Sequence, residues 1–268
     1  MNDINKKYGQ WALVTGASSG IGREFSIELA AKGFNLILVS RRESKLIETE
    51  KLIKNGSSAE VKLIVADLTT KQGISSLKEQ TSSFDIGLLV NNAGREDSGN
   101  FFDIPLKSSL TTLKLNCQVP LELTYHFGSK MKERGRGGII FMSSLVSYQG
   151  VPYVANYAGT KAYTLIFAES INAEFKKYNI DVLVATPGFT NTELASDWDF
   201  SGMPLKPLKS SFVAKEITRG LGKKTVVIPG FINKILYFTG KYFQPRWLNT
   251  LSFGIVFKKV LRNKISRG

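Results

Sequence analysis

The chain has 268 residues, of which 43% are apolar, so it is long enough to bury one large core or two small ones. Its single cysteine, Cys117, excludes an internal disulfide framework and suits a reducing compartment. The net charge is +14, but eleven of the 36 basic residues lie between residues 217 and 268, where there is no acid, which leaves 25 basic against 22 acidic residues elsewhere. The end of the chain therefore needs an explanation of its own.

Seven short apolar runs alternate with segments of helical periodicity. Near-continuous hydrophobicity is typical of strands buried on both faces of a parallel sheet. The predicted strands cover residues 11–16, 35–40, 61–67, 85–94, 137–144, 180–188 and 225–230. The helical segment 21–33 has Gly33 as its predicted C-cap. This alternation predicts an α/β fold, a doubly wound, mostly parallel seven-stranded sheet of Rossmann type, over residues 1–230.

A glycine-rich turn, TGASSGIG, separates the first predicted strand from the first helix. Glycines at this point allow a tight turn and close backbone approach, and the helix amides that follow point at negative charge. A turn without a ligand is the plain alternative, but a strand–turn–helix context favours a phosphate-bearing ligand. The predicted contacts are Gly16, Ser18, Ser19, Gly20, Ile21 and Gly22.

The second predicted strand ends in Ser40, Arg41 and Arg42, where an NAD site usually has an acid. A carboxylate there would repel a 2′-phosphate, whereas a guanidinium can bind one through charge-assisted hydrogen bonds. The alternative is that both arginines only solvate the helix start, although the helix dipole does not favour cations there. Arg41 and Arg42 therefore favour NADP(H) as the cofactor.

Tyr157 and Lys161 are four residues apart, a spacing that puts both on one helix face. A solvated helix face would have the same spacing, so other motifs must decide. The motifs, in chain order, are TGASSGIG, Asp67 in VADL, NNAG at 91–94, Asn116 in LKLNC, MSS at 142–144 at the end of the fifth strand, Tyr157 with Lys161, and PGFTNT from Pro187. With these motifs the chain resembles the short-chain dehydrogenase/reductases from residue 10 to about residue 229.

The resemblance implies roles for single residues. Ser144, thirteen positions before Tyr157, would hydrogen-bond the substrate carbonyl, with Ser143 the less favoured candidate. Tyr157 would be the acid/base, Lys161 would bind the nicotinamide ribose and lower the tyrosine pKa, and Asn116 would hold a water of the proton relay. The remaining cofactor contacts that it implies are Asp67, Leu68, Asn92, Ala93, Gly94, Pro187, Gly188, Thr190 and Thr192.

The chemistry of the residues agrees with these roles. A tyrosine with an ordinary pKa of about 10 needs a nearby positive charge to act as a base near neutrality. The only histidine, His126, has no serine or cysteine motif beside it, which leaves a Ser-His-Asp hydrolase unsupported. No spacing of Cys, His and acids suggests a metal, so we expect none.

Apolar residues near the site predict a hydrophobic substrate. Residues 192–210, where the family has its variable lid, contain Leu194, Trp198, Phe200, Met203 and Leu205, and Phe101 and Phe102 follow NNAG. We therefore expect an NADPH-dependent reductase of a ketone, aldehyde or 3-oxoacyl group on a lipid-like molecule. The alternatives are a steroid, retinoid or xenobiotic carbonyl reductase, and a non-catalytic NADP-binding sensor or scaffold.

The basic extension over residues 231–268 has apolar residues at helical spacing on either side of Pro245. Such a segment packs on its own domain, caps the substrate cleft, joins a partner subunit, or lies on an anionic membrane as a basic amphipathic helix does. Nucleic acid fits poorly because no binding fold is recognisable.

The resemblance also implies a homodimer through residues 106–133 and 152–178, with a tetramer less favoured because the chain continues past its last strand. The first residues lack the long apolar segment of a secretory signal, and no run reaches the roughly 18 uncharged residues of a membrane span. We expect a cytoplasmic protein, either free or peripheral at the inner face of a membrane.

Overall fold

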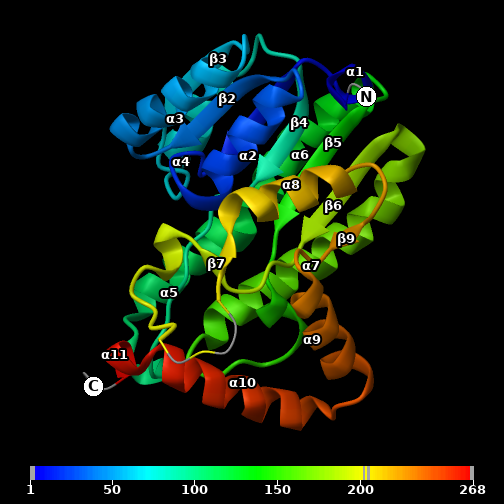
Figure 1. The fold of residues 1–268 in the computed structure, drawn as a ribbon. Coiled ribbons are helices and arrows are strands. Elements are labelled where there is room, and N and C mark those ends of the chain that lie inside the picture. The colour runs from blue at the N-terminus through cyan, green and yellow to red at the C-terminus, as the bar shows by residue number, and fades with distance from the viewer. Residues whose placement is uncertain (1–3, 202, 204–205, 266–268) are drawn as a thin grey trace.

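A seven-stranded parallel sheet forms the centre of the computed structural model, which describes residues 4–201, 203 and 206–265 (Figure 1). Its order is β3-β2-β1-β4-β5-β6-β9. The strands are β1 (Trp11–Thr15), β2 (Asn35–Ser40), β3 (Val61–Val65), β4 (Ile86–Asn91), β5 (Gly137–Met142), β6 (Ile180–Ala185) and β9 (Val226–Val227). The chain winds outwards from β1 in both directions, which confirms the predicted doubly wound sheet.

Helices cover both faces of this sheet. One face carries α2 (Gly20–Ala31), α3 (Glu43–Gly56) and α8 (Ser210–Gly220), and the other carries α4 (Lys71–Gln80), α6 (Val119–Glu133) and α7 (Ala155–Phe175). Alternate strand residues serve the two cores: Val14 packs under α2, whereas Leu13 packs on the opposite side. The short α1 (Ile4–Tyr8) contacts β4 and β5. A π-helical turn over Lys114–Gln118 joins α5 (Leu106–Leu113) to α6.

The predicted end of the first crossover helix is confirmed in its hydrogen bonds. Gly33 has φ +84°, its amide donates to Ala30 O at 2.9 Å, and the Phe34 amide donates to Leu29 O at 3.1 Å. This is the Schellman arrangement, in which a left-handed residue satisfies the last helix carbonyls. Glycine fits because a Cβ would strain that conformation.

Up to residue 265, the chain after β9 forms three helices beyond the carboxyl ends of the strands: α9 (Phe231–Tyr242), α10 (Arg246–Val260) and α11 (Arg262–Ile265) (Figure 1). Phe257 and Leu261 are buried in a third cluster with Val146, Val154 and Tyr157. The inner face of α10 therefore packs on the rest of the chain. Within the described residues, no helix combines the length and apolar character needed to cross a membrane.

A short pair of strands, β7 (Thr190–Asn191) and β8 (Leu208–Lys209), lies apart from the main sheet and was not predicted. It closes the base of the loop that the sequence assigns to the substrate lid. Leu205 of that loop lies outside the described residues.

Candidate active site

One cavity of about 1180 Å³ runs along the carboxyl ends of the strands. All residues predicted to contact the cofactor line it: Gly16, Ser18, Ser19, Gly20, Ile21, Gly22, Arg41, Arg42, Asp67, Leu68, Asn92, Ala93, Gly94, Tyr157, Lys161, Pro187, Gly188, Thr190 and Thr192. Ser144 lines the same cavity. Residues from position 16 to position 192 of the chain thus meet in one groove.

Two glycines of the glycine-rich turn, Gly16 and Gly22, lie too close to neighbouring backbone to be replaced by a residue with a side chain. A Cβ at Gly22 would lie 2.2 Å from Gly16 O, and one at Gly16, where φ is +67°, would lie 2.9 Å from Ala93 Cα. Asn92 Nδ2 adds a tie by donating to Thr15 O at 2.9 Å and to Gly16 O at 3.2 Å. The loops after β1 and β4 therefore form one rigid wall, along which a ligand can meet bare backbone.

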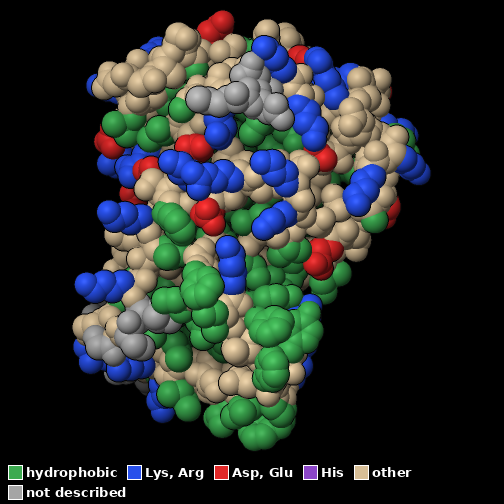
Figure 2. All heavy atoms as spheres, turned by 45° about the vertical axis from the view of Figure 1, so that its right-hand side comes forward, with side chains coloured by type: hydrophobic (Ala, Val, Ile, Leu, Met, Phe, Trp, Pro, Cys, Tyr) green, Lys and Arg blue, Asp and Glu red, His purple; other side chains and the backbone are tan. Residues whose placement is uncertain are grey.

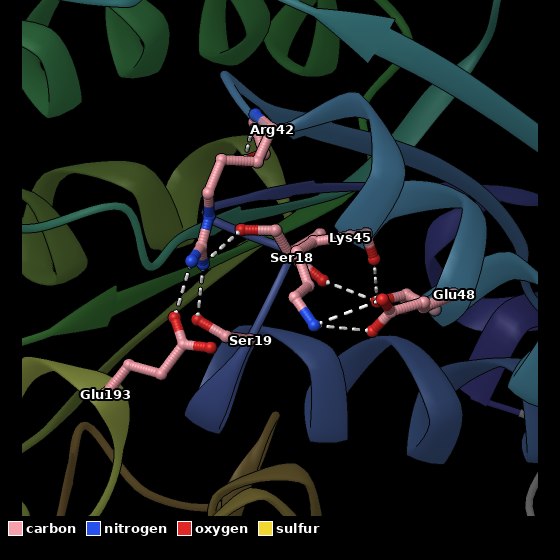
Figure 3. A network of polar contacts seen from close by, with 9 residues as sticks. Ser18, Ser19, Arg42, Lys45, Glu48 and Glu193 are labelled. Atoms are coloured by element: carbon pink, nitrogen blue, oxygen red, sulfur yellow. Dashed lines mark hydrogen bonds and ion pairs between the residues drawn. The ribbon is translucent and has the colours of Figure 1, made fainter. Parts of the chain in front are cut away.

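Arg42 reaches back over this wall (Figure 3). Its Nη2 donates to Ser18 Oγ at 3.0 Å and to Ser19 Oγ at 2.9 Å, while its Nη1 pairs with Glu193 Oε2 at 2.7 Å. The Arg42 hydrogen bond lowers the pKa of the Glu193 carboxyl, against a smaller effect of burial. The sequence reading missed Glu193, although an acid directly after Thr192 was a visible signal.

Arg41 acts on a different part of the groove. Burial opposes ionisation of Asp67, but hydrogen bonds from the Thr69 amide and hydroxyl and the charge of Arg41 lower the pKa of its carboxyl. The two arginines are thus divided, with Arg41 near Asp67 and Arg42 near Ser18.

Tyr157 and Lys161 both lie in the first turns of α7 and are 8% and 6% exposed. Lys161 Nζ donates to Met142 O at 2.7 Å, at the end of β5. Ser144 Oγ donates weakly to Pro187 O at 3.4 Å, whereas Ser143 Oγ donates to Lys161 O at 2.7 Å. A hydroxyl has a single hydrogen, so Ser143 has no donor left for a ligand in this arrangement.

Asn116 lies behind the cavity rather than in its wall. Its Oδ1 accepts from the Arg95 amide at 2.9 Å, and its Nδ2 donates to Arg95 O at 2.8 Å and to Thr160 Oγ1 at 3.0 Å. The side chain is thus satisfied within the protein, and the main-chain oxygen, in the π-helical turn, accepts from Thr164 Oγ1 at 3.4 Å and has one lone pair left.

The pKa of Tyr157 departs from the expectation. Burial raises the Tyr157 pKa and the charge of Glu96 raises it further, whereas the hydrogen bond with the Ser144 hydroxyl lowers it. Burial also lowers the pKa of Lys161 to about 8. Lys161 Nζ is 5.5 Å from the Tyr157 ring centroid and donates to Met142 O, so the expected lowering of the tyrosine pKa is absent here.

The far end of the cavity is apolar. Leu194, Trp198 and Met203 of the lid line it, together with residues of α9 and α10 such as Leu236 and Phe257. The prediction for the phenylalanines after NNAG was wrong. Phe101 and Phe102 are 68% and 95% exposed and do not line the cavity, because they precede α5 on the outer surface.

Contacts across the cavity rim join the lid to the end of the chain. Arg262 pairs with Asp199, and the Asp199 amide donates to Val260 O at 2.8 Å. Glu96, whose side chain is 6% exposed, accepts from Trp198 Nε1 at 3.3 Å and Lys264 Nζ at 3.0 Å. The lid, α10 and α11 therefore form one unit over Tyr157, and sequence reasoning missed Glu96.

Side chains suited to a metal do not gather in the described part of the chain. No group of three or more His, Cys, Asp or Glu is placed there so that it could hold an ion.

A doubly wound sheet with a glycine-rich first turn and a buried tyrosine and lysine in the same groove defines a nicotinamide-dependent oxidoreductase. A family model described as short chain dehydrogenase matches residues 10–200, and the chain belongs to that family. The family uses NAD or NADP, so the groove is a nicotinamide-cofactor site.

Two curated relatives and a solved structure are similar over most of the chain. A 7beta-hydroxysteroid dehydrogenase of Clostridium sardiniense is 30% identical over 238 residues, which cover 87% of this chain and 90% of that protein. A very-long-chain 3-oxoacyl-CoA reductase of Rattus norvegicus is 32% identical and covers 97% of this chain and 83% of that one. A 7beta-hydroxysteroid dehydrogenase structure matches with a TM-score of 0.85 and 26% identity, covering 93% and 98% of the two chains. These relatives support an enzyme that interconverts a carbonyl and an alcohol.

Proposed function

We propose that the protein uses NADPH to reduce a ketone, aldehyde or 3-oxoacyl group on a hydrophobic, lipid-like substrate. The observation that carries the proposal is the position of Tyr157. It stands where the glycine-rich groove gives way to the apolar end of the same cavity, with Ser144 and Lys161 beside it.

When bound, the nicotinamide supplies the hydride. Ser144 Oγ, on the cavity wall, hydrogen-bonds the substrate oxygen and stabilises the charge that develops on it. Tyr157 donates the proton to that oxygen during reduction and accepts it during oxidation. Its raised pKa keeps it protonated near neutrality, which suits the reductive direction.

Lys161 holds the ribose of the cofactor and supplies positive charge near the phenol. For this its Nζ must exchange the Met142 carbonyl for a ribose hydroxyl, a change of partner that a flexible side chain makes readily. The main-chain oxygen of Asn116 holds the water through which the proton is replaced.

The experiment is a screen of aldehydes, ketones and 3-oxoacyl thioesters that follows NADPH absorbance. Tyr157→Phe should reduce turnover about 10²- to 10⁴-fold and leave NADPH binding nearly unchanged. A Tyr157→Phe enzyme that works at the wild-type rate would show that the tyrosine is not the acid/base. NADPH binding without turnover of any carbonyl would favour the sensor or scaffold alternative.

Preference for NADPH is supported by the positive charge at the end of β2. Arg41 and Arg42 both line the groove, with Arg41 on the Asp67 side and Arg42 Nη2 donating to the Ser18 and Ser19 hydroxyls. A 2′-phosphate at this end of the groove would accept charge-assisted hydrogen bonds from the Arg42 guanidinium and would be attracted by the charge of Arg41. Alanine at either arginine should weaken NADPH about tenfold and spare NADH. Equal losses for the two cofactors would argue against this role.

A lipid-like substrate is favoured by the cavity wall and by the relatives. Leu194, Phe212, Phe231, Ile232 and Leu236 line the cavity and are also exposed, so the apolar lining continues onto the outer surface. The curated relatives are named for very-long-chain 3-oxoacyl-CoA and 7beta-hydroxysteroid substrates. A steroid, retinoid or xenobiotic ketone remains the second candidate, and the relative kcat/KM values in the screen decide between them.

A membrane surface is the partner we propose for the outer face of α9 and α10. Figure 2 shows hydrophobic side chains gathered at the lower end of the molecule, where these helices lie in Figure 1. The exposed apolar residues of this face are Phe231, Ile235, Phe238, Tyr242, Phe243, Trp247, Leu251 and Ile255. Because the face joins the cavity rim, a substrate could enter from the lipid, and the lysines and arginines of the extension favour an anionic leaflet. This makes the protein peripheral at the cytoplasmic side of a membrane.

Vesicle sedimentation tests this partner. The protein should sediment with phosphatidylserine vesicles at low salt and be released as salt shortens the Debye length below about 8 Å. Phe243→Ser with Trp247→Ser should weaken sedimentation without loss of NADPH binding, whereas Phe102→Ser, on a different face, should not. A wild-type protein that ignores anionic vesicles at low salt would refute the proposal.

A homodimer is proposed through the outer faces of α5, α6 and α7. Their exposed apolar residues include Leu106, Leu110, Tyr125 and Ile166, a set too large for an ordinary solvated face. Tyr125→Glu should convert the dimer to a monomer in sedimentation at micromolar concentration. A wild-type monomer would contradict it.

A further inference from the structure

The carboxylate of Glu193 pairs with the guanidinium of Arg42, which also donates to the Ser18 and Ser19 hydroxyls (Figure 3). Glu193 begins the short 3-10 turn Glu193–Ala195, directly after Thr192 in the lid. Its Oε2 is 2.7 Å from Arg42 Nη1, the guanidinium nitrogen beside the one that donates to both serines. Glu193, a residue of the lid, thus forms an ion pair with Arg42 of the cofactor groove.

A carboxylate and a phosphate compete for the same guanidinium because both present oxygens that accept from its N–H fork. Glu193 therefore stands in for an anionic oxygen of a ligand. The Arg42 and Glu193 side chains are 47% and 52% exposed, so solvent screens the pair and the guanidinium can exchange one anion for another at small cost.

Glu193 connects the start of the lid to the cofactor groove. Leu194, next to Glu193, and Trp198, one turn further, line the substrate end of the cavity. The Ala195 amide donates to Thr192 O at 3.1 Å, so the turn moves as a unit with the glutamate. The far side of the same segment is held separately, by the hydrogen bond from Trp198 Nε1 to Glu96 and by the one from the Asp199 amide to Val260 O.

We propose that Glu193 is an internal competitor for the 2′-phosphate of the cofactor. This inference rests on the proposed use of NADPH. NADH, which lacks the phosphate, leaves the Glu193–Arg42 pair in place. Glu193 is thus a specificity-determining residue that lowers the affinity for the phosphorylated cofactor.

The test compares two nucleotides that differ only in the 2′-phosphate, adenosine 2′,5′-bisphosphate and adenosine 5′-monophosphate, by titration calorimetry. Glu193→Gln keeps the shape and removes the charge, so it should tighten the bisphosphate about two- to fivefold and leave the monophosphate unchanged. In an Arg42→Met background, Glu193→Gln should have no effect on either ligand. Glu50→Gln, which removes a surface ion pair with Lys54 on α3, is the matched control.

Three outcomes would overturn the inference: unchanged bisphosphate affinity in Glu193→Gln, an equal gain for both nucleotides, or a loss, which would make Glu193 a clamp over the bound cofactor. Titration of wild-type protein with NADPH and NADH separates this from the proposed function. Binding of neither cofactor would overturn both proposals, whereas NADPH binding and turnover without the Glu193→Gln effect would overturn this one alone.

Discussion

Phe257→Ala tests whether the chain after β9 belongs to the catalytic core. Phe257 is 1% exposed, shares a cluster with Val146 and Tyr157, and its ring centroid lies 5.6 Å from those of both Phe189 and Trp198. Truncating a buried phenylalanine costs about 3 to 5 kcal/mol, and aromatic pairs contribute about 0.5 to 1.5 kcal/mol each within such a loss. We expect about 4 kcal/mol, which lowers the melting temperature of a chain of this size by about 10 °C.

The assay is urea and thermal unfolding of Phe257→Ala beside Phe243→Ala. Phe243 is 73% exposed on the same extension, and its truncation should change the free energy of unfolding by about 0.5 kcal/mol or less. Phe257→Ala should also raise KM, because the ring lines the cavity. If both variants unfolded like the wild type, α10 would not be packed on Tyr157 as described.

Two further predictions concern charge and backbone. Lys264→Met removes the cation that pairs with Glu96, so the negative charge of Glu96 should raise the pKa of Tyr157 further. The acid limb of the pH–rate profile for alcohol oxidation should then move to higher pH by about 0.5 to 1 unit. The control Lys258→Met, on α10, should leave that limb in place. Gly22→Ala places a Cβ within 2.2 Å of Gly16 O. It should therefore abolish NADPH binding in a fluorescence titration and destabilise the fold by about 1 to 3 kcal/mol. The control Gly56→Ala, whose Cβ would meet no atom within 4 Å, should have neither effect. An unshifted profile, or a Gly22→Ala protein that binds NADPH normally, would contradict the respective argument.

The sheet and the cofactor groove could be predicted because their signals are local. Each predicted strand exists, since an apolar run between turn residues has few other uses in an α/β chain. The ends were less certain: the run from residue 225 to 230 forms only Val226–Val227, because pairing with β6 stops where that neighbour ends. The end of a strand depends on where its hydrogen-bonding neighbour ends, and the spacing of apolar residues in the sequence does not indicate that position.

The contacts between distant segments could not be predicted. Lys264 and Glu96 are 168 positions apart, and nothing near either residue indicates the other. The pattern of apolar residues after residue 230 indicated helices but left open what they cover, and the structure divides them between an inner face on Tyr157 and an outer exposed face. The raised pKa of Tyr157 could not be predicted for the same reason, because burial under α10 and the charge of Glu96 depend on tertiary packing.

The contacts that join the lid to α10 and α11 affect the order in which the protein folds during its synthesis. A chain leaves the ribosome from its N-terminus, and domains tend to fold as their residues emerge. The glycine-rich turn, NNAG and Tyr157 all emerge before residue 231, so the cofactor groove can assemble while the substrate end is still open. The substrate end of the cavity can close only after Phe257 has packed against Tyr157 and Lys264 has paired with Glu96. A nascent chain held on the ribosome before residue 257 would therefore be able to bind nucleotide yet lack a substrate wall, and its exposed apolar cavity would be the surface that chaperones or a nearby membrane meet first.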